Sequence, residues 1–168
     1  NAAAFERLVL ENRLTKAIAQ KEFCLQYQPQ IDFQNGNIIG AEALIRWRHP
    51  YLGIVYPGEF IQVAEETDLI LPIGRWVLHQ ACIQNRIWQE KGFQPMRVGV
   101  NFSAQQFREK RMVEVVTKIL EQTELEPQYL GIEITESIAM RDIGYAISVL
   151  TGLRKMGIQI LIDDFGIG

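Results

Sequence analysis

Residues 130–163 read LGIEITESIAMRDIGYAISVLTGLRKMGIQILID, and this stretch decides the fold. It begins with β-forming residues at Leu130–Thr135 and continues into a predicted helix, Asp142–Met156, which Gly157 ends. A second apolar run, Ile158–Asp163, follows. A strand, a helix and a strand in this order form a parallel βαβ unit, so the stretch predicts a parallel sheet covered by helices.

The chain before this stretch continues the same alternation. The predicted strands are Phe23–Phe33, Ile38–Trp47 and Arg97–Phe102, and the predicted helices are Leu8–Gln20, Glu59–Glu66, Gly74–Lys91 and Arg108–Thr123. A tight turn at Asn35-Gly36 makes the first two strands antiparallel. The chain therefore predicts an α/β sheet or barrel that opens with one antiparallel hairpin. A doubly wound open sheet is the alternative, although neither GxGxxG nor a GKS or GKT sequence follows any strand.

The composition narrows the class of protein. With 168 residues and a formal net charge of -3, the chain fits one globular domain, and its mild acidity argues against DNA as a partner. No apolar run approaches the roughly 20 residues that span a bilayer, so we expect no membrane contact by this segment. Cys24 and Cys82 lie in apolar patterns without a short spacing, which favours reduced core cysteines and a cytoplasmic location. A membrane anchor in another domain stays open.

Four oxygen-bearing side chains stand at or near the carboxyl ends of four successive predicted strands: Glu42, Asn101, Glu133 and Asp163. In α/β barrels this end carries the active site. Taken singly, each has a structural explanation, because a strand Glu is commonly exposed, an Asn-x-Ser commonly caps a turn, and Asp163-Asp164 can open a turn. Three acids and an amide at equivalent positions favour one shared site.

Glycine recurs beside these polar side chains. Gly40, Gly99 and Gly131 each precede one of them by two residues and therefore share its face of the strand. The missing side chains predict room at the centre of a barrel.

A cluster of carboxylates needs a positive partner, because buried like charges repel one another. Apart from Arg46, no Lys or Arg stands at these strand ends. A divalent cation is therefore expected, and carboxylate and amide oxygens suit Mg²⁺ or Mn²⁺. The adjacent acids Asp163 and Asp164 allow a second metal, and paired metals are a common device for splitting phosphodiesters. His49 and His79 are isolated, and we interpret both as structural.

The motifs of the chain resemble those of the EAL domain family. Glu42-Ala43-Leu44 followed by Arg46 matches the E-A-L-x-R signature. The matching segments around it are YQPQ at 27–30, PGEFIQVAEE at 57–66, Asn101-Phe102-Ser103, Glu133-Ile134-Thr135-Glu136 and Asp163-Asp164-Phe165-Gly166. Their order and spacing fit the family from Leu8 onward.

This resemblance implies a (βα)8 TIM-like barrel with one antiparallel strand, and a Mg²⁺- or Mn²⁺-dependent phosphodiesterase that opens cyclic di-GMP to the linear dinucleotide pGpG. By family pattern, the metal ligands are Glu42, Asn101, Glu133, Asp163 and Asp164, and the catalytic residues are Glu42, Asp163 and Asp164. Gln28, Leu44 and Arg46 match substrate contacts, with Arg46 suited to a phosphate oxygen. Water between two metals would be the nucleophile.

The chain departs from the family pattern near its end. Ile167 stands where the family usually has Thr, and the chain stops at Gly168 before the family's later strands, which carry a Lys and further acids. We therefore expect residues 8–168 to be the amino-terminal part of an EAL domain, with about five strands. Residues 1–7 would be a linker or an added end. The isolated chain is expected to be inactive, and its open strand edge favours a longer protein over a homodimer.

Three classes of function remain open from the sequence. The first is an active phosphodiesterase, favoured by the intact acids. The second is a catalytically inactive EAL domain that acts as a cyclic di-GMP sensor. The third is an interaction domain without either role. The family also implies an upstream GGDEF or sensor domain.

Overall fold

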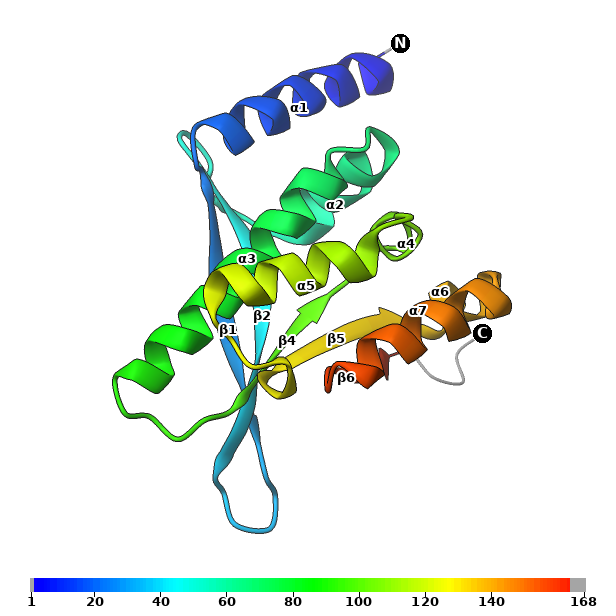
Figure 1. Cartoon of the computed structure of the whole chain (residues 1–168). Coiled ribbons are helices and arrows are strands. Elements are labelled where there is room, and N and C mark those ends of the chain that lie inside the picture. The colour runs from blue at the N-terminus through cyan, green and yellow to red at the C-terminus, as the bar shows by residue number, and fades with distance from the viewer. Residues whose placement is uncertain (1, 164–168) are drawn as a thin grey trace.

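A computed structural model describes residues 2–163, which form one six-stranded sheet and a set of helices (Figure 1). The strands are β1 (Phe23–Ile31), β2 (Ile38–His49), β3 (Gly53–Val55), β4 (Arg97–Asn101), β5 (Leu130–Thr135) and β6 (Gln159–Asp163). The helices are α1 (Ala2–Ala19), α2 (Pro57–Glu66), α3 (Ile70–Glu90), α4 (Ala104–Phe107), α5 (Met112–Thr123), α6 (Glu136–Arg141) and α7 (Ile143–Lys155), with a 3-10 turn at Pro127–Tyr129.

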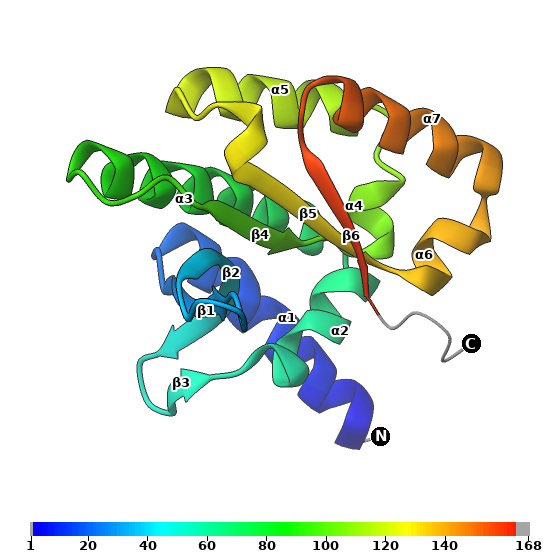
Figure 2. The ribbon, with the colours of Figure 1, turned by 90° about the horizontal axis from the view of Figure 1, so that it is seen from below.

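The strand order is β1-β2-β4-β5-β6, with the short β3 paired to β2. β1 and β2 are antiparallel, whereas β2, β4, β5 and β6 run parallel in succession. The predicted hairpin and βαβ units are therefore confirmed. Figure 2 shows α3, α5 and α7 arranged on the same side of the parallel strands.

The two faces of the sheet differ in chemistry because side chains alternate along a strand. Towards the helices, β4 and β5 present side chains with no exposed surface, among them Val98, Val100, Leu130 and Ile132. Phe23 of β1 packs on the same side, with its ring centroid 6.1 Å from that of Trp76 in α3. The opposite face carries the polar residues of the strands and faces the interior of the predicted barrel.

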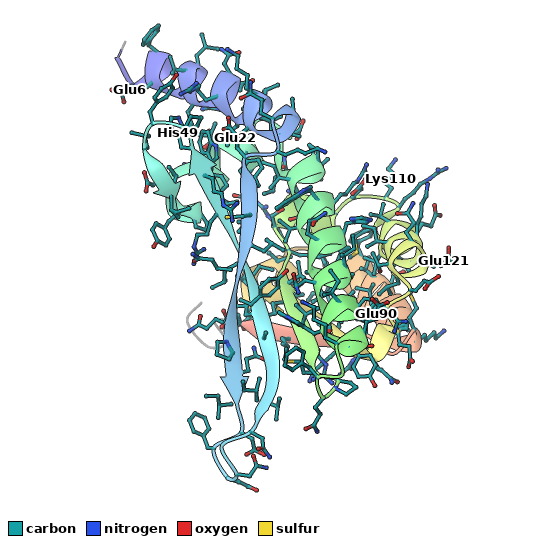
Figure 3. All side chains as sticks on the ribbon, turned by 90° about the vertical axis from the view of Figure 1, so that its left-hand side faces the viewer. Glu6, Glu22, His49, Glu90, Lys110 and Glu121 are labelled. Atoms are coloured by element: carbon teal, nitrogen blue, oxygen red, sulfur yellow. The ribbon has the colours of Figure 1, made fainter. Side chains whose placement is uncertain are left out.

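The β1–β2 hairpin extends beyond the helical layer (Figure 3). Near its turn, Phe33 is fully exposed and Ile38 and Ile39 are each 56% exposed. At its other end, β2 and β3 lie under α1, where the Nη2 of Arg13 is 3.0 Å from the Nε2 of His49. His49 Nδ1 also accepts backbone N–H groups from the following turn, which agrees with a structural role for this residue.

The structure also corrects several predicted boundaries. Helix α1 begins at Ala2 rather than Leu8, and the helix expected from Arg108 begins at Met112. The short elements β3, α4 and α6 were not predicted, so the described sheet has six strands rather than about five. These elements are three to six residues long, too short for a hydrophobic period to be recognised in the sequence.

Helix α3 begins at Ile70, so that Gly74 lies inside it rather than at its start. Glycine disfavours helix interiors, but the packing of α3 against its neighbours overrides that preference. No helix in the described range 2–163 combines the length and apolar character needed to cross a membrane.

Candidate active site

Four of the predicted site residues lie on the polar face of the sheet. The register pairs Asn101 with Glu133 and pairs Thr135 with Asp163, while Glu42 lies opposite Gly99. Asn101 and Asp163 are the last residues of β4 and β6. Because parallel strands end at the same edge, these side chains gather at the carboxyl edge of the sheet, where α/β barrels build their sites.

Two of these side chains are in direct contact. The Nδ2 of Asn101 donates a hydrogen bond of 2.7 Å to the Oε1 of Glu42. The amide is therefore oriented with its nitrogen toward the acid, and its oxygen remains available to bind a cation or to accept a hydrogen bond.

Glu133 lies at the buried centre of this group, with only 8% of its surface exposed. Burial raises the pKa of its carboxyl to about 7, and the negative charges of Glu42 and Asp163 add to the shift. Its Oε1 is buried and has no hydrogen-bond partner among the described residues. A buried, unpaired carboxylate oxygen beside two other acids is stabilised by a cation, so these residues fit a divalent metal.

The structure gathers the predicted metal ligands only in part. Within residues 2–163, no three His, Cys, Asp or Glu side chains form a group close enough to hold a metal ion. Asn101 adds an amide oxygen to the described acids, and Asp164 lies outside the described residues. Carboxylate and amide oxygens are the donors that Mg²⁺ and Mn²⁺ prefer.

Gly99 provides the space that Glu133 occupies. A Cβ atom at Gly99 would lie 2.4 Å from the Oε1 of Glu133, far inside contact distance. The room expected beside the polar residues is therefore present here, although it is filled from the neighbouring strand rather than by Asn101. At Gly131 the nearest atom is the Cδ of Arg97, at 3.2 Å.

Arg97 is a residue of this face that the sequence analysis missed. It is the first residue of β4, and its side chain lies over Gly131 with a buried Nε that has no hydrogen-bond partner in the described range. The sequence could have indicated this position, because Arg97 lies two residues before Gly99 and residues two apart share a strand face.

The three predicted substrate contacts lie along the hairpin next to these acids. Gln28 is paired with Glu42 across the antiparallel register, and Leu44 follows Glu42 on the same face. The Nε of Arg46 donates 2.9 Å to the Oε1 of Gln26, and its guanidinium lies 4.8 Å from the ring centroid of Tyr56. Arg46 is therefore held in place by two neighbours.

A cavity of about 310 Å³ opens beside these residues. Leu44 and Asn101 line it from the sheet, and Pro57, Ile61 and Ile73 line it from α2 and α3. It is mostly apolar with polar groups at the strand ends, which is the usual character of a small-molecule site.

The fold and these side chains define an α/β protein of barrel type with an acidic site at the carboxyl edge of its strands. The chain belongs to the EAL domain family, which it matches over residues 11–168.

Relatives of known name are longer than this chain. It is 45% identical over 168 residues to the bifunctional diguanylate cyclase/cyclic di-GMP phosphodiesterase MucR of Pseudomonas aeruginosa, covering all of this chain and 24% of that protein. It is 36% identical over 168 residues to the cyclic di-GMP phosphodiesterase PdeR of Escherichia coli, covering all of this chain and 25% of PdeR. The chain thus spans about a quarter of the length of these curated relatives.

Solved structures agree with the family. The PaMucR phosphodiesterase in complex with c-di-GMP superimposes with a TM-score of 0.92 at 44% identity, covering 95% of this chain and 64% of that one. The EAL enzyme Bd1971, in its cAMP- and cyclic-di-GMP-bound form, gives 0.91 at 34% identity, covering 99% of this chain and 46% of that one. The predicted fold class is confirmed, and this chain corresponds to part of the EAL barrel.

Proposed function

We propose that the full-length protein containing this chain is a metal-dependent phosphodiesterase that hydrolyses cyclic di-GMP to pGpG. The observation that carries the proposal is the contact of Asn101 with Glu42 beside the buried, unpaired Oε1 of Glu133. Such oxygens at the carboxyl edge of a parallel sheet suit Mg²⁺ or Mn²⁺. Relatives named as cyclic di-GMP phosphodiesterases support the choice of substrate.

The ligand roles follow from the chemistry of the side chains. Glu42, Asn101, Glu133 and Asp163 would hold one metal ion, and Asp163 with Asp164 would hold a second. Metal ions bound there would supply the positive charge that lowers the pKa of a water and stabilises the attacking and leaving oxygens of a phosphodiester. Glu42 and Asn101 orient one another through their hydrogen bond.

Arg46 is the residue proposed to bind a phosphate oxygen. Its contacts with Gln26 and Tyr56 hold the guanidinium in place, which lowers the entropy lost when a ligand binds. Leu44 would provide apolar contact with a base in the cavity that it lines, and Gln28 would add a polar contact beside Glu42.

The remaining expectations belong to the same proposal. MucR is named for a cyclase activity as well as a phosphodiesterase activity, which supports a GGDEF or sensor domain elsewhere in the full-length protein. We propose a cytoplasmic location, because cyclic di-GMP is an intracellular signalling dinucleotide in the family that the sequence resembles. Whether the full-length protein forms a homodimer is tested by measuring its mass in solution.

The test is hydrolysis of cyclic di-GMP by the full-length protein, followed by chromatographic separation of the products. With Mg²⁺ or Mn²⁺ we expect pGpG to accumulate, and with excess EDTA we expect hydrolysis to stop and to resume when metal is restored. Binding of cyclic di-GMP with no product at any metal concentration would assign the protein to the sensor class. Neither binding nor product would contradict both roles.

A further inference from the structure

The segment after Asn101 is closed by a reciprocal pair of hydrogen bonds. The Oγ of Ser103 accepts a hydrogen bond of 3.2 Å from the backbone N–H of Gln106, and the Oε1 of Gln106 accepts one of 3.1 Å from the backbone N–H of Ser103. This capping box places Ser103, two residues after Asn101, as the N-cap of α4, which begins at Ala104. The conformation of the turn that follows the end of β4 therefore depends on the side chain of Gln106.

Gln106 is in turn held by helix α3. It is only 7% exposed, and a Cβ atom at Gly74 would lie 1.8 Å from its Nε2 and 2.3 Å from its Cδ. Any side chain at position 74 would occupy the space that the amide of Gln106 fills, which gives a physical reason for glycine inside α3. The amide of Gln106 is thus packed between the Ser103 turn and the backbone of α3.

Further contacts anchor the same segment on both sides. Arg75 of α3 forms an ion pair with Glu109, and the Nε2 of Gln105 donates 2.8 Å to the Oδ1 of Asp68. On the other side, the hydroxyl of Tyr145 in α7 donates 3.1 Å to the backbone oxygen of Glu109. The segment is therefore a fixed element between two helices.

The end of β4 is also tied to the neighbouring strand. The backbone N–H of Phe102 donates 2.8 Å to the backbone oxygen of Glu133. The bond at Phe102 and the closed turn at Ser103 therefore hold the backbone directly after Asn101, and the pairing of β4 with β5 holds the backbone before it. With the backbone held on both sides, the Asn101 amide keeps its nitrogen on Glu42, which leaves its oxygen free of that bond.

We propose that Gln106 is a positioning residue for the metal site, acting through the Ser103 turn on the amide of Asn101. The absence of a side chain at Gly74 leaves the space in which the Gln106 side chain packs. The inference rests on the proposed role of Asn101 as a metal ligand. Residues that orient metal ligands without touching the metal typically change metal affinity 10- to 100-fold when removed. Gln106 acts on one ligand of several, so its removal should fall at the lower end, about 10-fold.

The test uses the full-length protein and Mn²⁺ as the probe. Calorimetric titration gives the Mn²⁺ affinity of Gln106→Ala, Gly74→Ala, the double variant and Asn101→Ala, each at a temperature where circular dichroism shows it folded. Hydrogen exchange of the Ser103 and Gln106 amides is measured in the metal-free protein. The matched control is Gln105→Ala, which removes the same side chain from the neighbouring position, together with its hydrogen bond to Asp68, but leaves the capping box intact.

We expect about 10-fold weaker Mn²⁺ binding and faster amide exchange in Gln106→Ala and in Gly74→Ala, and less than about a twofold change in Gln105→Ala. In the double variant, Gly74→Ala should add nothing, because the shortened side chain at position 106 leaves room for the new methyl group. If Asn101→Ala loses affinity while Gln106→Ala keeps it within about twofold, the positioning role is wrong and the proposed function stands. If Asn101→Ala keeps wild-type affinity, the proposed role of Asn101 is wrong, and the positioning role falls with it. An equal loss in Gln105→Ala would show that the effect does not depend on the capping box, and would also overturn the inference.

Discussion

Replacing Gly99 with Ala tests how closely the acidic site is packed. The new Cβ would lie 2.4 Å from the Oε1 of Glu133 and 3.3 Å from its Cδ. For the oxygen to reach an ordinary contact of 3.4 Å, it has to retreat by about 1 Å, the difference between 3.4 and 2.4 Å. Only 8% of the surface of Glu133 is exposed, so the side chain has little space into which to move.

The expected magnitude follows from this displacement. A reacting group misplaced by 1 Å can lose about 100-fold in rate, and overpacking a filled interior typically costs about 1–3 kcal/mol of stability. We therefore expect Gly99→Ala to remain folded, to hydrolyse cyclic di-GMP about 100-fold more slowly, and to bind Mn²⁺ at least about 10-fold more weakly. The measurements are steady-state hydrolysis by the full-length protein and calorimetric titration with Mn²⁺.

Gly131→Ala is the matched control, because Gly131 lies next to Gly99 in the register. Its new methyl group would meet the Cδ of Arg97 at 3.2 Å, so a shift of a few tenths of an ångström in a flexible side chain relieves the contact. We expect less than about a fivefold change in rate for this variant, since no proposed metal ligand has to move. Wild-type hydrolysis and Mn²⁺ affinity in folded Gly99→Ala would refute the packing argument.

Three further predictions concern two of the acidic residues, Arg46 and the two cysteines. Glu42→Ala and Asp163→Asn should each abolish hydrolysis in the full-length protein, because each removes a carboxylate oxygen from the proposed metal site. Unchanged turnover of either variant at saturating Mg²⁺ would show that the site is elsewhere. Arg46→Ala should raise KM for cyclic di-GMP by about 10- to 100-fold, since a charged hydrogen bond to phosphate contributes about 1.5–3 kcal/mol. The affinity for Mn²⁺ should stay within about twofold of wild type. Normal nucleotide affinity in a calorimetric titration would count against this role. Burial raises the pKa of the Cys82 thiol to about 12 from 9.0, so the fold favours its neutral form and the associated stability declines as the pH rises from about 9 toward 12. At a pH of about 8, below both of these values, a thiol-reactive dye should therefore label only the half-buried Cys24 until the protein is unfolded. Rapid labelling of both cysteines in the native state would contradict the burial of Cys82.

Periodicity along the chain was sufficient to predict the central architecture. Leu130–Thr135 was predicted with the observed bounds, and the Asn35-Gly36 turn correctly indicated an antiparallel hairpin. Strand alternation also placed Glu42, Asn101 and Glu133 on one face, because successive side chains of a strand point to opposite sides. These features are local, so a single sequence contains the information needed to infer them.

Features that depend on distant contacts were decided only by the tertiary structure. The raised pKa of Glu133 arises from burial and from acids on two other strands, and nothing within its own segment indicates it. The helix predicted to start at Gly74 begins at Ile70, and the side chain of Gln106, 32 residues later in the numbering, occupies the space that this glycine leaves inside the helix. Local preference differs among residues by only about 1 kcal/mol, and tertiary packing readily exceeds it. The sequence by itself therefore determined the five longer strands, their parallel order and the faces of the site residues. Only packing between separate segments decided how closely those residues meet and what holds them there.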